Sequence, residues 1–117
     1  MKENKLADQS MDFSVQIINL VKDLKAKHES VISNQIGRSG TSIGANIHEA
    51  NYAQSKADFI AKLQIALKEC YETEYWLELF VKAELLDRDK AKNIYNDCGT
   101  IRKILISSVN TAKGNSN

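Results

Sequence analysis

The segment from Gln35 to Glu49, QIGRSGTSIGANIHE, separates into three chemically distinct stripes when it is wound as a helix at about 100° per residue. Isoleucines form one stripe, glycines form a second beside it, and short polar or charged side chains form a third. The members are Ile32, Ile36, Ile43 and Ile47; Gly37, Gly40 and Gly44; and Gln35, Arg38, Ser42, Asn46 and Glu49. An amphipathic surface helix needs only the first stripe, so the other two predict specific contacts.

The glycine stripe predicts a close neighbour. Each glycine in a helix interior costs about 1 kcal/mol relative to alanine, and close approach by the backbone of another helix would offset that cost. We expect this second helix to supply a glycine-lined contact surface and the third helix to supply an aromatic one.

Composition favours an all-α fold. The 117 residues include no proline and only five glycines, whereas strand proteins of this size need many glycine- and proline-rich turns. No apolar run reaches about eighteen residues. The N-terminal MKENKLADQS lacks the apolar region of a signal peptide, so we expect a cytoplasmic protein without membrane contact.

Apolar residues repeat at helical spacing in four segments. Asp8 or Ser10 can cap the first helix, Ser55 with Asp58 forms a capping box before the third, and Asp87 can cap the fourth. The expected helices cover about 10–28, 29–52, 56–84 and 88–113. Short connections place successive helices antiparallel.

The sequence therefore predicts an all-α, antiparallel up-down-up-down four-helix bundle over residues 10–113. A flexible N-terminus is expected at 1–9, a disordered tail at 114–117, and an interruption of the last helix at Gly99. Cys70 and Cys98 occupy apolar helix positions, so we expect buried, reduced thiols. A redox or disulfide role is the alternative.

Two stretches, QIGRSGTSIGANIHEA and DFIAKLQIALKECYETEYWLELF, resemble bacterial four-helix-bundle proteins first noticed as open reading frames in intervening sequences of 23S ribosomal RNA genes. The likeness spans about residues 10–110. Ala50 and Asn51 depart from the family pattern, because many relatives have glycine directly after the glutamate. The matching residues are Gln35, Ile36, Arg38, Ser42, Ile43, Asn46, Ile47 and Glu49, then Ile65, Ala66, Leu67, Lys68, Glu69, Glu72, Thr73, Tyr75, Trp76 and Leu77.

The resemblance implies a bundle that assembles as a ring-shaped homopentamer. A related member, the accessory protein of diversity-generating retroelements, forms a pentameric barrel that binds nucleic acid and partners a reverse transcriptase. No biochemical activity is settled for the intervening-sequence members. The resemblance thus implies a fold and an assembly, and points to nucleic acid only indirectly.

The polar stripe of the second helix has two interpretations. In one, Arg38 presents its planar guanidinium to the phosphate or carboxylate of a ligand, beside its short polar neighbours. In the other, which we favour, Arg38 pairs with Glu49, or with Glu69 or Glu72 of the third helix, and locks helices or subunits together.

Aromatic residues of the third helix also have two interpretations. Tyr71, Tyr75 and Trp76 could form a stacking platform for single-stranded nucleic acid. Aromatic residues at such spacing on a bundle helix more often lie in a core or a subunit contact, where tryptophan is favoured. We expect Trp76 at a subunit interface.

The fourth helix is mildly basic. Residues 85–117 contain six basic and three acidic side chains, whereas residues 55–84 contain four basic and six acidic ones. Lys92, Arg102 and Lys103 are the candidate contacts for RNA or DNA phosphates, and a ring would multiply their charge. A solvated helix face is the alternative.

The sequence offers no pattern for catalysis, cofactor binding or a metal. The Glu-x-x-His pattern of di-iron bundles does not occur, and the glycines of the second helix follow no strand, unlike those of a phosphate loop. We expect a non-catalytic, self-assembling interaction scaffold, a homopentamer with RNA or DNA as its most plausible ligand and no small-molecule substrate. Alternatives are an adaptor without nucleic acid, which docks a partner helix in an apolar groove, and, more distantly, an enzyme using Arg38 and Glu49.

Overall fold

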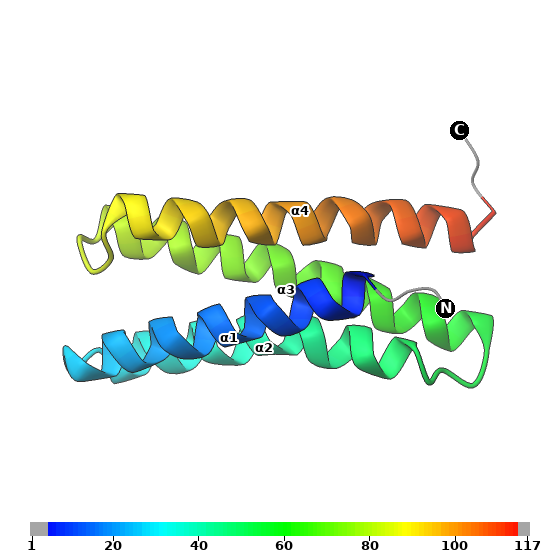
Figure 1. Ribbon diagram of the computed structural model, residues 1–117, viewed down its shortest axis with the longest axis horizontal. Helices are drawn as coiled ribbons and strands as arrows, with labels where there is room; N and C mark the ends of the chain where they lie inside the picture. Colours follow the sequence, from blue (N-terminus) through cyan, green and yellow to red (C-terminus); the bar gives the residue numbers. More distant parts are fainter. Residues whose placement is uncertain (1–4, 115–117) are drawn as a thin grey trace.

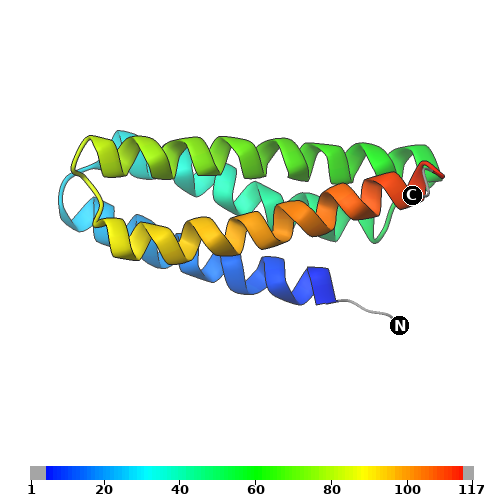
Figure 2. The same ribbon diagram turned by 90° about the horizontal axis from the view of Figure 1, so that it is seen from above.

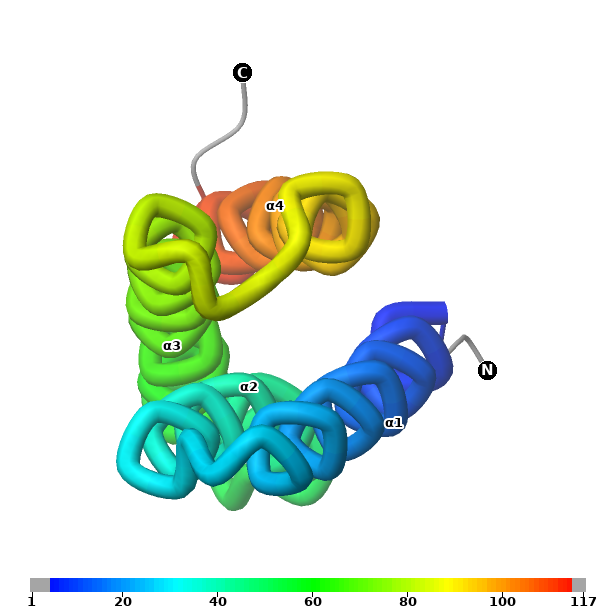
Figure 3. The backbone as a smooth tube through the Cα atoms, turned by 90° about the vertical axis from the view of Figure 1, so that its left-hand side faces the viewer, coloured from blue at the N-terminus to red at the C-terminus, as the bar shows by residue number. Residues whose placement is uncertain are grey.

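The structure, a computed structural model, describes residues 5–114, which form four α-helices joined by short loops. Successive helices run in opposite directions (Figure 1), and α4 lies between α3 and α1 (Figure 2). The end-on view places the helices around a common core, with α1 and α3 on a diagonal (Figure 3). The predicted four-helix bundle is confirmed. The helix bounds are α1 (Lys5–Ala26), α2 (Ser30–Ala50), α3 (Lys56–Lys82) and α4 (Arg88–Ala112).

The starts of α3 and α4 are capped as the sequence predicts. Ser55 Oγ accepts the backbone N–H of Asp58 at 3.0 Å. The Asp87 carboxylate accepts the backbone N–H groups of Asp89 and Lys90 at 3.1 and 3.2 Å. These bonds satisfy backbone donors that a helix leaves unpaired in its first turn.

Two local predictions were wrong. α1 begins at Lys5, so neither Asp8 nor Ser10 caps it; Ser10 is buried within the helix, and its hydroxyl donates to the Ala7 carbonyl at 3.0 Å. α4 runs without interruption through Gly99, which is buried. The expected flexible N-terminus is therefore helical from residue 5, while residues 1–4 and 115–117 lie outside the described part of the chain.

Non-glycine residues in left-handed backbone geometry terminate α1 and α3. His28 and Glu84 have φ angles of 66° and 62°. In each case the following N–H donates to a carbonyl five residues earlier, at 2.9 Å after α1 and 2.8 Å after α3. Glycine usually occupies the left-handed position in this arrangement. Because His28 and Glu84 stand there instead, the sequence gave no glycine to mark these helix ends. α2 and α3 each end two residues before their expected limits of 52 and 84.

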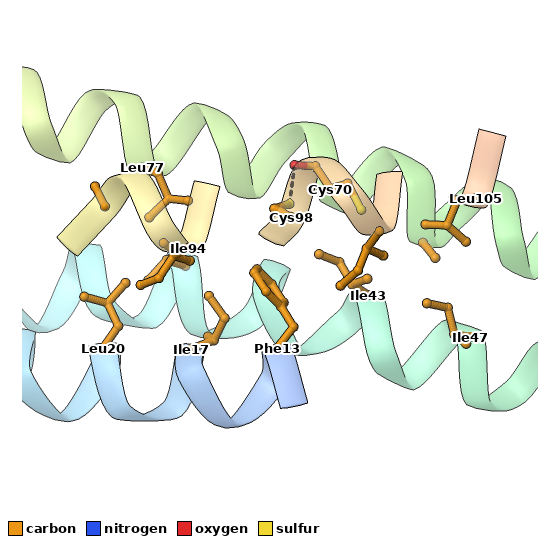
Figure 4. Packing of buried hydrophobic residues seen from close by; sticks show 14 of the residues in the cluster. Phe13, Ile17, Leu20, Ile43, Ile47, Cys70, Leu77, Ile94, Cys98 and Leu105 are labelled. Atoms are coloured by element: carbon orange, nitrogen blue, oxygen red, sulfur yellow. Dashed lines mark hydrogen bonds between the residues drawn. The ribbon is translucent and has the colours of Figure 1, made fainter. Parts of the chain in front are cut away.

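Side chains from all four helices meet in one core (Figure 4), which includes Phe13, Ile43, Leu77 and Leu105. The isoleucine stripe of α2 is buried as predicted, apart from the half-buried Ile32. The thiols of Cys70 and Cys98 are buried and unbonded to each other, and that of Cys98 donates to the Cys70 carbonyl at 3.5 Å. A hydrogen bond with Cys70 and burial raise the pKa of Cys98. The expectation of buried, reduced thiols is confirmed.

The glycine stripe of α2 lies against α1 of the same chain. A Cβ atom on Gly40 would come within 2.7 Å of Ile17 Cγ1, and one on Gly44 would come within 3.0 Å of Ser14 Oγ. Close approach by a neighbouring helix is thus confirmed. Because α1 occupies the stripe, the expectation that it supplies a contact surface for another subunit was wrong.

Polar side chains form hydrogen bonds and ion pairs between α1 and α4. Gln16 Nε2 donates to Asp97 Oδ2 at 2.9 Å, and Lys90 forms an ion pair with Asp23. The hydrogen bond from Lys90 and its charge lower the pKa of Asp23. The backbones of the diagonal helices α1 and α3 lie farther apart than those of neighbouring helices. The side of each that points away from the core is its outward face.

Candidate functional site

A charged network joins the second and third helices. Arg38 of α2 reaches two carboxylates of α3, with Nη1 3.4 Å from Glu69 Oε1 and Nη2 bonded to Glu72 Oε2. Trp76 Nε1 donates to the same Glu72 oxygen at 2.9 Å. The Trp76 hydrogen bond, together with Arg38, lowers the pKa of Glu72, and the bond to Glu72 raises the pKa of Arg38. Arg38 therefore links the two helices through two carboxylates.

The rest of the polar stripe does not join this network. Glu49 pairs with Lys62 of α3 at 3.0 Å, and the Asn46 amide donates to the carbonyl of Ser42 at 2.9 Å. Gln35 is exposed. Of the three acidic partners predicted for Arg38, Glu69 and Glu72 form ion pairs with it, whereas Glu49 does not. The polar stripe therefore contains two separate ion-pair links from α2 to α3. Between them, the Asn46 side chain bonds to the backbone of its own helix.

A third α2–α3 link, between two hydroxyl groups, is buried. Thr73 Oγ1 lies 2.9 Å from Ser39 Oγ, both residues are fully buried, and the Ser39 hydroxyl is 3.5 Å from the Ile36 carbonyl. Buried hydroxyls need such partners. Thr73, which the sequence marked as a family-pattern residue, therefore fixes the packing of α2 on α3.

The outward face of α3 is apolar and aromatic; we call Tyr71, Tyr75 and Leu79 the α3 face. Their exposed fractions are 52%, 57% and 38%. Lys68 is exposed on the same side, and no described acid pairs with it. Trp76 is half-buried beside this face, stacked on Phe80 with ring centroids 6.1 Å apart. It also contacts the Tyr75 ring edge-on, with centroids 5.2 Å apart, and so supports the α3 face.

Sequence reasoning missed a matching apolar face on α1. Met11, Val15 and Ile18 follow helical spacing, with exposed fractions of 65%, 51% and 46%; we call them the α1 face. Their spacing of four and three residues was the available signal, but the stronger core stripe led by Phe13 and Ile17 obscured it. A helix apolar on two faces requires a second covering surface or leaves one face exposed.

The structure separates the three basic candidates of α4. Arg102 Nε donates to Glu74 Oε2 at 2.9 Å, Glu74 is 7% exposed, and the guanidinium lies 5.6 Å from the Tyr71 ring centroid. The bond to Glu74 raises the pKa of Arg102. Lys92 and Lys103 are exposed, without a described acidic partner. Arg102 thus stabilises the α3–α4 contact, and two of the three remain accessible.

Within residues 5–114, no three His, Cys, Asp or Glu side chains gather in a way that could hold a metal ion. No described helix is both long and apolar enough to cross a membrane. The main surface features are ion pairs that link neighbouring helices and the two exposed apolar faces on α1 and α3.

The sequence of residues 2–107 matches the family model described as 23S rRNA-intervening sequence protein. The chain belongs to that family. A similar protein with a solved crystal structure is a protein of unknown function from the S23 ribosomal protein family, from Bacteroides thetaiotaomicron VPI-5482. It is 55% identical, the match covers 89% of this chain and 97% of that one, and the TM-score is 0.87. No curated protein matches this chain.

Membership in the 23S rRNA-intervening sequence protein family confirms the resemblance seen in the paired α2 and α3 stretches. Those stretches contain Arg38, Glu69, Glu72, Thr73 and Trp76, which the fold brings together along the α2–α3 contact. The family-pattern residues thus account for how α2 packs on α3.

Proposed function

We propose that this protein is a non-catalytic, cytoplasmic interaction scaffold that assembles with copies of itself through the α1 and α3 faces. The observation that carries the proposal is the presence of two different uncovered apolar faces on diagonal helices (Figure 3). Two unlike faces on opposite sides favour head-to-tail contacts, which close into a ring when the rotation permits. A ring of five follows from the family resemblance.

Charge supports pairing of the α1 face of one copy with the α3 face of the next. Asp12 flanks the N-terminal half of the α1 face, and Lys68 flanks the N-terminal end of the α3 face. α1 and α3 run in the same direction (Figure 1). In a ring whose axis follows the bundle, these opposite charges lie at the same end of the contact.

A matched pair of valine variants tests self-assembly. Val15→Asp places a charge in the centre of the α1 face, whereas Val31→Asp places one on α2, where Val31 is 75% exposed and outside both faces. We expect Val15→Asp to reduce the mass measured by light scattering to that of one chain, and Val31→Asp to keep the wild-type mass. Equal masses for both variants and the wild type would exclude the α1 face as a contact.

RNA or DNA is the second candidate ligand, on a more limited observation. Lys92 and Lys103 lie on one side of α4, about 16 Å apart along the helix, and both are exposed. A ring would repeat this pair around its circumference. Binding of an oligonucleotide should weaken steeply with salt and with Lys92→Ala/Lys103→Ala; absence of binding at low salt would exclude it.

A further inference from the structure

A groove lies between the C-terminal half of α3 and the first turns of α4. It encloses about 520 Å³, within the range of ligand pockets. Its floor is aliphatic, formed by Leu77, Val81 and Ala91. Leu77 and Ala91 belong to the core, so the floor is rigid.

One wall of the groove is fixed by a hydrogen bond. Tyr95 Oη donates to Glu78 Oε2 at 2.8 Å across the α3–α4 contact. This bond, with partial burial, raises the pKa of Tyr95 to about 12. The Glu78 carboxylate therefore already accepts a hydrogen bond from another residue of the groove.

Three cations line the rim of the groove. Lys82, Arg88 and Lys92 are all exposed, and none forms an ion pair with a described acid. An aliphatic floor beneath unpaired cations is complementary to an apolar side chain flanked by carboxylates.

We propose that this groove binds an acidic amphipathic helix of a partner protein. The apolar residues of that helix would lie on Leu77, Val81 and Ala91, and its flanking carboxylates would reach the rim cations. Nucleic acid fits less well. The floor of Leu77, Val81 and Ala91 is aliphatic and offers no ring for base stacking, and Tyr95, the aromatic residue of the wall, is partly buried.

Fluorescence anisotropy with a defined peptide tests the proposal. The probe is a labelled amphipathic peptide of about four helical turns, with leucines along one face and glutamates on both flanks. We expect saturable binding to the full chain that weakens about tenfold with Arg88→Glu/Lys92→Glu, since attractive pairs become repulsive. The matched control, Lys56→Glu/Lys113→Glu, reverses two exposed cations outside the groove and should bind as wild type.

Circular dichroism confirms that both double variants are folded before binding is compared. No saturable peptide binding, or equal weakening by both double variants, overturns the proposal. If the peptide does not bind, but an oligothymidylate binds and is weakened by Arg88→Glu/Lys92→Glu, the groove is a nucleic-acid site instead. If Arg88→Glu/Lys92→Glu changes the light-scattering mass, the groove is a subunit contact. Loss of peptide binding with unchanged mass leaves the self-assembly proposal untouched.

Discussion

Ile17 of α1 packs directly against Gly40 of α2. A Cβ atom added to Gly40 would lie 2.7–2.9 Å from three side-chain carbons of Ile17. Ile17 is itself fully buried, so it has little room to move. Glycine at this position is therefore required by packing between two helices of the same chain.

Gly40→Ala is expected to lower the free energy of unfolding. Alanine gains about 1 kcal/mol in helix propensity, but overpacking of a buried isoleucine costs about 1–3 kcal/mol, so a net loss of about 1 kcal/mol follows. Gly99→Ala is the control, because a Cβ there meets only the end of Arg102 at 3.4 Å. It should stabilise by about 0.5–1 kcal/mol; urea denaturation measures both, and a stabilised Gly40→Ala contradicts the packing account.

His28→Gly is expected to raise stability. A non-glycine residue in the left-handed region costs about 1–2 kcal/mol, and His28 ends α1 with φ 66° while its side chain is exposed. We expect a gain of about 1 kcal/mol, partly offset by the entropy of glycine in the unfolded chain. Thermal unfolding measures it, and a lower midpoint for His28→Gly would show that its side chain makes a stabilising contact.

Arg102→Ala is expected to destabilise the bundle by about 2–4 kcal/mol, because it leaves the buried Glu74 carboxylate without its cation. The neighbouring Lys103→Ala removes an exposed charge and should change stability by less than about 0.5 kcal/mol. Chemical denaturation of the two variants separates these outcomes. Equal, small effects would mean that the Glu74–Arg102 pair contributes little. Arg102 is in either case unsuitable as a test of phosphate binding unless folding is measured first.

Stability is expected to fall in acid partly through Glu72. Its folded-state pKa is lowered from 4.5, first by the Trp76 hydrogen bond and then by Arg38. A lowered pKa stabilises the fold above the unfolded-state pKa, and this contribution is lost as pH falls through the folded-state value. Glu72→Gln should therefore flatten the decline of the melting temperature below about pH 4.5.

Trp76→Phe provides the complementary measurement for Glu72, because it keeps an aromatic ring over Phe80 and removes the indole N–H. It should also flatten the acid decline, because a Glu72 pKa closer to its unfolded-state value leaves less stability to be lost as the pH falls. A Glu72→Gln protein whose stability follows the wild-type profile throughout this range would show that the network does not set the acid response.

A charge exchange tests the register proposed for the subunit contact. Asp12→Lys and Lys68→Glu each place like charges at one end of the α1–α3 pairing and should each weaken self-association about tenfold. The double variant restores opposite charges and should recover the wild-type mass at the same concentration. Light scattering across a dilution series measures all three. If the double variant is as weak as the sum of the single ones, Asp12 and Lys68 are not neighbours.

The sequence predicted those parts of the fold that depend on periodicity and capping. Ser55 and Asp87 mark helix starts because their side chains replace missing backbone partners, and that chemistry is local. His28 and Glu84 gave no such signal, since no glycine stands at those helix ends. The start of α1 was missed because the side chains of Asp8 and Ser10 suit a cap but also fit within a helix.

The candidate site was predicted only where residue types limited the partners. Arg38 needed a carboxylate, and Glu69 and Glu72 were among the three considered, but only the crossing of α2 and α3 excluded Glu49. The α1 face was missed because Val15 and Ile18 lie next to core residues in the sequence. Which of two apolar stripes is buried depends on neighbouring helices, which sequence spacing alone does not reveal.

The absolute mass of the purified wild-type protein tests the central claim most directly. Light scattering after gel filtration, with absorbance recorded at about 260 and 280 nm on the same peak to detect copurified nucleic acid, gives the number of chains. We predict a mass of about five times the 13.1 kDa of one chain. A single-chain mass at high protein concentration would contradict self-assembly and leave the α1 and α3 faces to a different partner.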